Sequence, residues 1–449
     1  MLDKSVKTIY LLGIKGTGMS SLAVLLQKLG YSVTGSDTSE HFFTESQLKD
    51  NDISYFNGFD PAHLQPAPDL VIASTAYNER NIEFSEAKLL KIPMISYPEA
   101  VGEISKKLTS VAICGSHGKT TTTSMLGAVM ETSHETVTLT GTVADGLNTK
   151  LDKPKYFVFE ADEYQNKFQF YSPANVILTN IDFDHPDYFK NVGHYEQTFA
   201  EFISRTLSTG GYVLYNFDDS RARRVMSSCT GNIESYGYDP GNNYCISNVS
   251  EQLNSFTIRR DDKDLVTLEL TVFGKHNILN AAASAIMALH LGISPDQVQS
   301  ALKNFRGVKR RMEIVPSEKY TIIDDYGHHP TEIAATLGAI RNKYKDKNIV
   351  AVFHPHTFTR TKALLKEFGS SFTDANLVLV LDIYPSAREV TGTITTQEVV
   401  DEIKKNGANV VYTPSIPEAA EYIQKNVAEG SVVLTIGAGD VWKLCDLIK

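Results

Sequence analysis

Two segments of this sequence share one pattern, in which an apolar run ends in a glycine-containing turn and a helix-like stretch follows. They are YLLGIKGTGMSSLA at residues 10–23 and VAICGSHGKTTTTSM at residues 111–125. A strand that leads through a tight turn into a helix is typical of parallel sheets with helical crossovers. Backbone N–H groups of the turn and the helix N-terminus can hold a phosphate group. The two segments therefore predict an α/β fold with two phosphate-binding turns.

Short β-branched runs, each followed by a helical pattern, recur along the chain and predict three α/β domains. The expected strands are 8–12, 31–34, 70–73 and 93–96, then 110–114, 156–160, 175–179 and 212–215, then 320–323, 348–353, 377–381, 409–412 and 431–436. We expect a Rossmann-like N-terminal domain at 1–105, a P-loop ATPase domain at 106–307 and a Rossmann-like C-terminal domain at 308–449. Alternating polar and apolar residues at 240–273 predict a small antiparallel addition to the middle domain.

The composition is that of an ordinary globular protein. The net charge of −10 argues against general affinity for nucleic acids. The 4 cysteines are scattered without a C-x-x-C pair, which argues against a disulfide framework or a zinc site. No run approaches the roughly 20 apolar residues that span a bilayer, and the start lacks the apolar core of a signal peptide. We expect a cytoplasmic protein without membrane insertion.

The second turn carries the stronger phosphate-binding signal. Lys119 can reach the β- and γ-phosphates of a nucleotide, and the Thr120 hydroxyl can ligate Mg²⁺. Ile113 stands where the G-x-x-x-x-G-K-[ST] pattern has its first glycine, so a purely structural turn is the alternative. The residues expected to bind ATP here are Cys114, Gly115, Ser116, His117, Gly118, Lys119, Thr120 and Thr121.

Acidic residues follow the next two expected strands of the middle domain. Glu160 ends one strand in FVFEADEY, and Asp182, Asp184, His185 and Asp187 follow the other in TNIDFDHPDYF. The carboxyl ends of parallel strands face the crevice where α/β proteins bind ligands. Taken singly, each acid could cap a helix or fill a loop. As a group beside a P-loop they favour Mg²⁺, because a single histidine among hard oxygen ligands suits zinc less well.

The first turn leaves its nucleotide open. Its glycines read G-x-x-G-x-G, the reverse of the dinucleotide pattern, although Asp37 stands about where that pattern has its ribose-binding acid. An NAD-dependent oxidoreductase is one interpretation, and the diphosphate of another nucleotide is the other. The hydroxyls of Ser74 and Thr75 could reach the same crevice or cap a local turn.

Two further clusters lie later in the chain. Asn277 and Asn280 share one face at the start of an alanine-rich helix, where their amides could contact a purine or pack between domains. In the third domain, histidines and Arg360 lie just beyond two strands, 320–323 and 348–353, which we expect to be adjacent. Such a cluster is hard to explain as packing.

Eight segments together resemble the Mur ligases, and they occur in order across nearly the whole chain. They are GIKGTGMS, GSHGKTTTT, EADE, TNIDFDH, GKHNILNAAA, RRME, DDYGHHPTE and PHTFTRT. The resemblance implies an ATP-dependent amide-forming ligase of cell-wall precursor synthesis, which phosphorylates a carboxylate so that an amine can attack the acyl phosphate. The chain is most similar to members that join L-alanine to UDP-N-acetylmuramate. The segment EADEY leaves open the related ligase that attaches a recovered tripeptide to the same sugar.

The resemblance also implies roles for individual residues. The N-terminal domain would hold the UDP-sugar through Gly16, Thr17, Gly18, Met19, Ser20, Asp37, Ser74 and Thr75. Lys119, Glu160, His185 and His328 would be catalytic, with Thr120 and Glu160 holding one Mg²⁺ and His185 a second. Asn277 and Asn280 would contact adenine, and Arg311 and Asp325 the phosphate and ribose. His328, His329 and Arg360 would form the alanine pocket, with the arginine pairing the alanine carboxylate.

Two positions depart from the family pattern. Several members carry a carbamoylated lysine after the DH histidine, whereas this chain has no lysine between Lys190 and Lys263, so Glu201 could supply that carboxylate instead. Thr357 replaces the first arginine of the PHRYTRT segment found in some alanine ligases. Two alternative functions remain open, a P-loop ATPase without ligation chemistry and the NAD-dependent oxidoreductase. We expect the protein to be a monomer or a homodimer.

Overall fold

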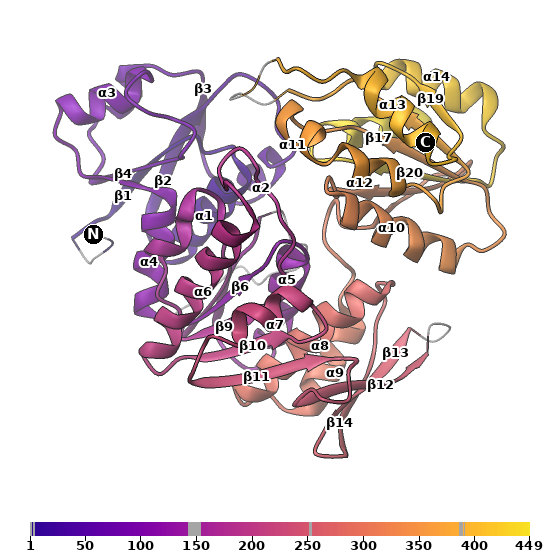
Figure 1. The fold of residues 1–449 in the computed structure, drawn as a ribbon. Helices are drawn as coiled ribbons and strands as arrows, with labels where there is room; N and C mark the ends of the chain where they lie inside the picture. Colours follow the sequence, from indigo (N-terminus) through magenta and orange to yellow (C-terminus); the bar gives the residue numbers. More distant parts are fainter. Residues whose placement is uncertain (1, 3–4, 142–153, 251–253, 386–388, 390) are drawn as a thin grey trace. The chain divides into compact units, whose positions relative to one another are not determined.

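The computed structural model describes residues 2, 5–141, 154–250, 254–385, 389 and 391–449 (Figure 1). They form two compact units. The first comprises Met1–Ile181, Glu196–Leu270 and Asn280–Phe305, and the second comprises Asp182–Tyr195, Thr271–Leu279 and Arg306–Lys449. No helix in the described part of the chain has the length and hydropathy that crossing a bilayer requires.

The first sheet of unit 1 has five described strands, all parallel, in the order β3-β2-β1-β4-β5. The strand order reverses between β1 and β4, and α/β sheets bind ligands at the carboxyl ends beside such a reversal. The glycine-rich turn follows β1 at this point. The elements are β1 (Thr8–Leu12), α1 (Thr17–Lys28), β2 (Ser32–Asp37), α2 (Glu45–Asp50), β3 (Tyr55–Asn57), η1 (Pro61–Leu64), β4 (Leu70–Ala73), α3 (Ile82–Leu89), β5 (Met94–Ser96) and α4 (Tyr97–Lys107).

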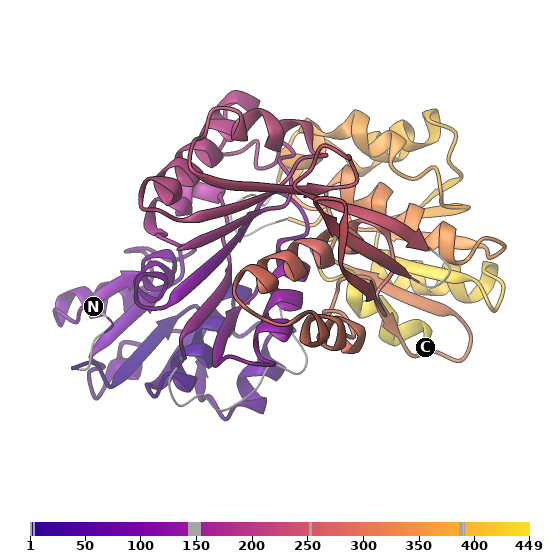
Figure 2. The same cartoon turned by 90° about the horizontal axis from the view of Figure 1, so that it is seen from below.

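The second sheet has nine described strands in the order β14-β13-β12-β11-β10-β9-β6-β8-β7, and Figure 2 shows it from below. Strands β6 to β11 of this sheet are parallel. Strand β6 lies between β8 and β9, so the P-loop follows a central strand and not an edge strand. The strands are β6 (Thr109–Cys114), β7 (Thr136–Leu139), β8 (Tyr156–Glu160), β9 (Asn175–Leu178), β10 (Tyr212–Asn216) and β11 (Asn232–Gly237). The helices around them are α5 (Lys119–Met130), η2 (Tyr164–Phe170), α6 (Val192–Ser208), α7 (Ser220–Met226), α8 (Lys275–His290) and α9 (Pro295–Asn304).

The antiparallel addition to this sheet is confirmed. It consists of β12 (Tyr244–Ser250), β13 (Ser255–Arg260) and β14 (Lys263–Glu269), which pair antiparallel with one another. The addition joins the parallel part through only two residue pairs, Tyr236 with Tyr244 and Gly237 with Cys245. This ribbon therefore extends the sheet away from the strands that carry the P-loop (Figure 1).

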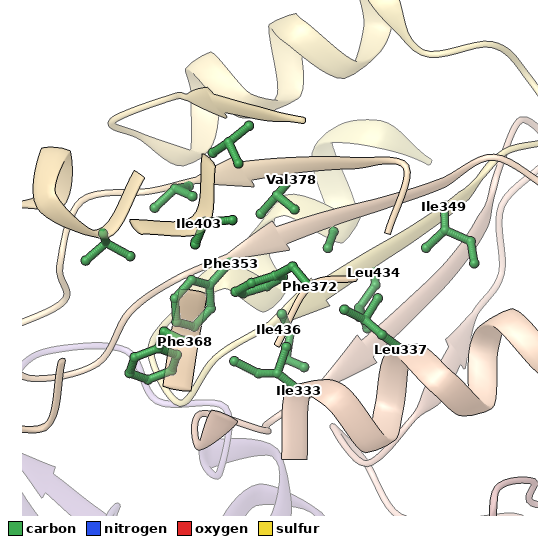
Figure 3. Packing of buried hydrophobic residues seen from close by; sticks show 14 of the residues in the cluster. Ile333, Leu337, Ile349, Phe353, Phe368, Phe372, Val378, Ile403, Leu434 and Ile436 are labelled. Atoms are coloured by element: carbon green, nitrogen blue, oxygen red, sulfur yellow. The ribbon is translucent and has the colours of Figure 1, made fainter. Parts of the chain in front are cut away.

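The sheet of unit 2 has six described strands in the order β15-β16-β20-β17-β18-β19, all parallel except the edge strand β15. Phe353, Phe368 and Phe372 pack with aliphatic side chains on one face of it (Figure 3). The strands are β15 (Glu313–Val315), β16 (Thr321–Asp325), β17 (Ile349–Phe353), β18 (Leu377–Val380), β19 (Val410–Tyr412) and β20 (Val432–Ile436). The helices are α10 (Pro330–Lys343), α11 (Phe358–Ala363), α12 (Leu365–Ser370), α13 (Thr396–Lys405), α14 (Ile416–Asn426), η3 (Val441–Lys443) and α15 (Leu444–Ile448).

The predicted three-sheet α/β architecture is confirmed, with three differences. The expected adjacency of the strands before the two histidine clusters is wrong, because β20 pairs with both β16 and β17 and lies between them. Strand β2 extends through Gly35, Ser36 and Asp37, since pairing with β1 and β3 outweighs the weak strand preference of that run. Strands β3, β7, β11 and β15 are not among the expected strands.

Candidate active site

The P-loop is a tight turn between β6 and α5. Gly118 has a φ of +80°, and a Cβ atom there would lie 2.5 Å from Oδ1 of Asn280, so this position requires glycine. Asn180 accepts from the Ser116 N–H through its carbonyl at 3.1 Å and from the His117 N–H through Oδ1 at 2.9 Å. Because those two N–H groups are engaged, the N–H groups at the start of α5 are the better donors for a phosphate.

Lys119, the first residue of α5, turns its side chain back over its own loop. Its Nζ donates to the carbonyl of Gly115, to that of Ser116 at 3.1 Å, and to Oε2 of Glu163 at 3.4 Å. Glu163 is buried, so this contact holds a lysine cation beside the turn. Phosphate oxygens are stronger acceptors than carbonyls and could compete for the same ammonium group.

The structure brings together Thr120 and Glu160, the two residues expected to hold Mg²⁺. The Thr120 hydroxyl donates to Oε2 of Glu160 at 2.9 Å, and the Gly141 N–H donates to the same oxygen at 2.9 Å. The contact forms because β6 and β8 are neighbours and end at the same edge of the sheet. A hydroxyl and a carboxylate are hard oxygen ligands, so these residues fit Mg²⁺.

The two asparagines of α8 differ in their surroundings. Asn280 lies against the P-loop at Gly118, and one turn later the Ser284 hydroxyl donates to the Thr122 carbonyl at 3.1 Å. In unit 2, the amide of Asn277 donates to the Phe273 carbonyl at 2.8 Å. The position of Asn280 beside the phosphate turn supports a nucleotide contact more directly than that of Asn277.

Asp37 stabilises the glycine-rich turn after β1 through hydrogen bonds. This buried carboxylate accepts from the Lys15 N–H at 2.8 Å, the Thr38 N–H at 2.8 Å and the Tyr77 hydroxyl at 2.9 Å. Met19 and Ser20 are also buried, which leaves the backbone of the turn to face a ligand. The Ser74 hydroxyl accepts from the Ala76 N–H at 3.3 Å, so it caps a local turn, and Thr75 is exposed.

Lys15 also stabilises this turn, a role that the sequence did not predict. Its side chain is 1% exposed, and Nζ lies 2.9 Å from the Thr38 carbonyl, 2.7 Å from Oδ1 of Asn57 and 3.1 Å from Oε1 of Glu45. These partners are 23 to 42 residues away in the sequence, and an isolated lysine in a glycine turn gives no signal of them.

Unit 2 gathers the predicted alanine-pocket residues around a buried ion pair. The Arg360 guanidinium donates to Asp184 through Nε at 3.0 Å and through Nη2 at 3.5 Å, and Nη1 lies 3.4 Å from Nδ1 of His356. Burial favours the neutral form of Asp184, but the charge of Arg360 holds the pKa of this carboxyl well below its usual range. Asp184 is one of several acids that follow a strand in the sequence, but its ion pair with Arg360 was not predicted.

Two histidines beside this ion pair, His328 and His356, are neutral at pH 7. Burial, followed by the charge of Arg360, lowers the pKa of His328 to about 3 and that of His356 to about 4. His185 lies next to the pair, with Nε2 3.8 Å from Oδ2 of Asp184. His329 caps α10, accepting from the Thr331 N–H at 3.3 Å, so its ring has a structural task as well.

The residues expected to contact the ATP phosphate and ribose lie beside β16. Asp325 is buried and accepts from the Met312 N–H at 2.9 Å and the Gly327 N–H at 2.7 Å. Burial raises the pKa of Asp325 to about 6 despite the charge of Arg311. The Arg311 guanidinium lies 5.1 Å from the Tyr326 ring centroid and 3.9 Å from Glu332.

Glu201 is exposed on α6 and accepts from Gln197 at 2.8 Å, which gives no support to a role in place of the modified lysine.

Comparisons with known proteins agree across the chain. Three family models match: "Mur ligase family, catalytic domain" at residues 8–109, "Mur ligase middle domain" at 113–288, and "Mur ligase, glutamate ligase domain" at 310–439. The chain is 38% identical over 444 residues to a UDP-N-acetylmuramate–L-alanine ligase from Desulfitobacterium hafniense, covering 97% of this chain and 98% of the relative. A ligase of the same name from Lactobacillus acidophilus is 38% identical, with coverage of 100% and 99%.

Solved structures give the same result. The UDP-N-acetylmuramate-alanine ligase from Thermotoga maritima superposes with a TM-score of 0.82 at 28% identity, covering 99% of this chain and 98% of the other. A murein peptide ligase from Psychrobacter arcticus gives a TM-score of 0.73 at 26% identity, covering 98% of each chain. Similarity of this identity and coverage, together with a P-loop whose Thr120 meets Glu160, shows that the chain belongs to the Mur ligase family.

Proposed function

We propose that this chain is an ATP-dependent ligase that joins L-alanine to the carboxylate of UDP-N-acetylmuramate in peptidoglycan precursor synthesis. The observation that carries the proposal is full-length similarity to relatives that bear this name. The domain boundaries at 105 and 307, the cytoplasmic location and a monomeric or homodimeric state are predictions that go with it.

The chemistry explains why two phosphate-binding turns are needed. A carboxylate resists attack by an amine, because it is anionic and has no good leaving group. Transfer of the γ-phosphoryl group from ATP gives an acyl phosphate and ADP, and the amine of alanine then attacks the carbonyl carbon to release phosphate. One turn therefore holds the UDP-sugar and the other holds ATP, and only ATP is cleaved.

The nucleotide- and metal-binding residues would bring positive charge to the place where two anions must meet. Lys119 would exchange its carbonyl contacts for the β- and γ-phosphates, and the N-terminus of α5 would receive a phosphate oxygen. Thr120 and Glu160 would hold one Mg²⁺ ion, and His185 would hold a second. When bound, these ions would neutralise the negative charge of the phosphates. Asn277, Asn280, Arg311 and Asp325 would hold the rest of the nucleotide.

The unit 2 residues would prepare the amino acid. Arg360, fixed by Asp184, would pair the carboxylate of alanine with its remaining N–H groups. The ammonium group of alanine must lose a proton before it can attack. His328, which is neutral at pH 7 because of its low pKa, is the candidate acceptor.

A second candidate function is the ligase that attaches a recovered tripeptide to the same sugar. The similarity to a murein peptide ligase structure and the EADEY segment favour it over any unrelated activity. An NAD-dependent oxidoreductase would not need a second phosphate-binding turn with Lys119, nor the contact between Thr120 and Glu160.

The test is phosphate release from ATP in the presence of UDP-N-acetylmuramate and one amine at a time. We would supply L-alanine, glycine, L-serine or the tripeptide L-Ala-γ-D-Glu-meso-diaminopimelate, with omission of the UDP-sugar as the control. Release dominated by L-alanine is the expected result. Release dominated by the tripeptide would assign the recycling ligase, and release without any UDP-sugar would indicate an ATPase.

A further inference from the structure

Tyr97 lies beside the glycine-rich turn of unit 1. It is the first residue of α4, directly after β5, and its direction is fixed by a capping box. In that box the Ser96 N–H donates to Oε2 of Glu99 at 2.7 Å, and Pro98 occupies the second helical position. The side chain of Tyr97 therefore leaves a well-defined helix start and not a loose loop.

The phenol ring of Tyr97 lies directly on the glycine-rich turn. A Cβ atom at Gly18 would lie 2.8 Å from both Cζ and the hydroxyl oxygen of Tyr97, closer than any real contact. A side chain at position 18 would therefore displace the Tyr97 ring, although the backbone of Gly18 is not in the left-handed region. Gly18 is the second residue of α1, whose N-terminus follows the turn (Figure 1). The Tyr97 hydroxyl thus lies at the end of α1 where the diphosphate of the UDP-sugar would bind.

Tyr97 lies within the electrostatic influence of Glu160, which ends β8, and of Asp162, which follows it. Burial raises the pKa of Tyr97, and the charges of Glu160 and Asp162 raise it further. A phenol has an ordinary pKa of about 10, so the Tyr97 hydroxyl is protonated at neutral pH and can donate a hydrogen bond. In the described part of the chain its hydroxyl has no hydrogen-bond partner, whereas the hydroxyls of Tyr10 and Tyr77 donate to Glu83 and Asp37.

We propose that the Tyr97 hydroxyl is a substrate-binding group, which donates a hydrogen bond to a diphosphate oxygen of the UDP-sugar on the glycine-rich turn. This inference rests on the proposed function. Asp162, and Glu160 when it holds no metal ion, repel an anionic substrate, and a neutral donor beside the turn offsets this repulsion. A lysine there would instead be drawn to the two carboxylates, so a protonated phenol suits the position.

The experiment compares UDP binding to the whole chain and to the Tyr97→Phe variant by titration calorimetry. Phenylalanine keeps the ring on Gly18 and removes only the hydroxyl. We expect UDP and UDP-N-acetylmuramate each to bind about ten-fold more weakly, since a hydrogen bond to a charged group is lost. The Michaelis constants for ATP and L-alanine should stay within about two-fold of those of the unaltered chain.

Tyr171→Phe is the matched control. Tyr171 is 1% exposed, and Glu160 and Asp162 also raise its pKa, but burial closes it off from a ligand. Its substitution should leave UDP affinity unchanged. The rise in melting temperature that UDP causes gives a second readout within each variant, which removes any difference in the stability of the free chains.

Equal UDP affinity in Tyr97→Phe and the unaltered chain would overturn the inference. Weaker binding of UDP-N-acetylmuramate with unchanged binding of UDP would also overturn it, because the hydroxyl would then contact another part of the sugar nucleotide. A chain that binds UDP-N-acetylmuramate but releases no phosphate with L-alanine would contradict the proposed function alone. The two failures are therefore distinguishable.

Discussion

Lys119 and Asp325 show how single charged residues at the candidate site are held before any ligand arrives. Lys119 is bonded to carbonyls of its own loop and to buried Glu163. Asp325 is buried with two backbone N–H donors. Both side chains have defined positions at the carboxyl edge of a parallel sheet, which reduces the entropy lost when a ligand binds.

Lys119→Ala should abolish turnover and leave UDP-N-acetylmuramate binding unchanged. The lysine belongs to the turn after β6, whereas the glycine-rich turn follows β1 in a different sheet. Loss of a cation that stabilises phosphate charge in the transition state typically costs several orders of magnitude in rate. Phosphate release measures the first effect and calorimetry the second. Turnover above about one tenth of the original rate would remove Lys119 from the ATP site.

Asp325→Asn should change stability in a pH-dependent way. The pKa of Asp325 is about 6 in the folded chain, above its ordinary value of 3.8, mainly because of burial. Protonation therefore stabilises the fold: the contribution is complete below about pH 4 and is lost as the pH rises through 6. At most about 3 kcal/mol is involved, since each pKa unit corresponds to about 1.4 kcal/mol. Asn does not titrate, and Arg311 and Glu332, the charges that face this site, are the same in both chains.

The measurement is the melting temperature of both chains at pH 5 and pH 7.5. We expect the variant to be more strongly destabilised at pH 5 than at pH 7.5, relative to the unaltered chain. A difference that does not change with pH would mean that Asp325 has the same pKa in the folded and unfolded states.

At the scale of elements, the loop after β9 and the helix α11 are joined by the ion pair of Asp184 and Arg360. Both side chains are less than one tenth exposed, with exposed fractions of 8% for Asp184 and 9% for Arg360. Removing one partner of such a pair leaves an uncompensated buried charge, which is strongly destabilising. The same pair orients the guanidinium that is proposed to bind the amino acid.

Arg360→Ala should raise the Michaelis constant for L-alanine about 100-fold and that for ATP less than two-fold. A charge-assisted pair with a carboxylate is lost, and the nucleotide turns lie in the other unit. An unchanged constant for alanine would remove Arg360 from the pocket.

Asp184→Asn tests whether the aspartate acts through Arg360. It should raise the alanine constant about ten-fold in the unaltered background and have little further effect in Arg360→Ala. Such non-additivity is the signature of two residues that work as a unit. Additive effects in the double variant would show that Asp184 acts independently of the arginine.

Local signals in the sequence predicted much of this fold and of the site. The two glycine turns, the core strands and the contact between Thr120 and Glu160 follow from runs of adjacent residues and from the rule that parallel strands end at one edge. The place of β20 between β16 and β17 did not follow, because strand pairing joins segments about 110 residues apart in the sequence. The buried contacts of Lys15 and Tyr97 likewise join distant segments, and no short motif records them.

For the whole molecule, the main feature is that the proposed catalytic residues are divided between two compact units. Lys119, Thr120 and Glu160 belong to one, and His185, His328 and Arg360 to the other. Acyl transfer requires the attacking nitrogen and the carbonyl carbon to approach within about 3–3.5 Å. The proposed reaction therefore requires ligands held by both units to come together.

We expect a non-hydrolysable ATP analogue, added with UDP-N-acetylmuramate, to reduce the radius of gyration measured by small-angle X-ray scattering. The reason is that ligands which contact both units favour the arrangements in which both sets of contacts are made. The Lys119→Ala chain, which should bind the UDP-sugar but not hold the nucleotide phosphates, should show a smaller change. If the unaltered chain scatters identically with and without both ligands while calorimetry shows that they are bound, then binding does not bring the two units together. In that case the residues of unit 2 would have to reach the acyl phosphate in the unliganded arrangement, and L-alanine should bind equally well before and after ATP.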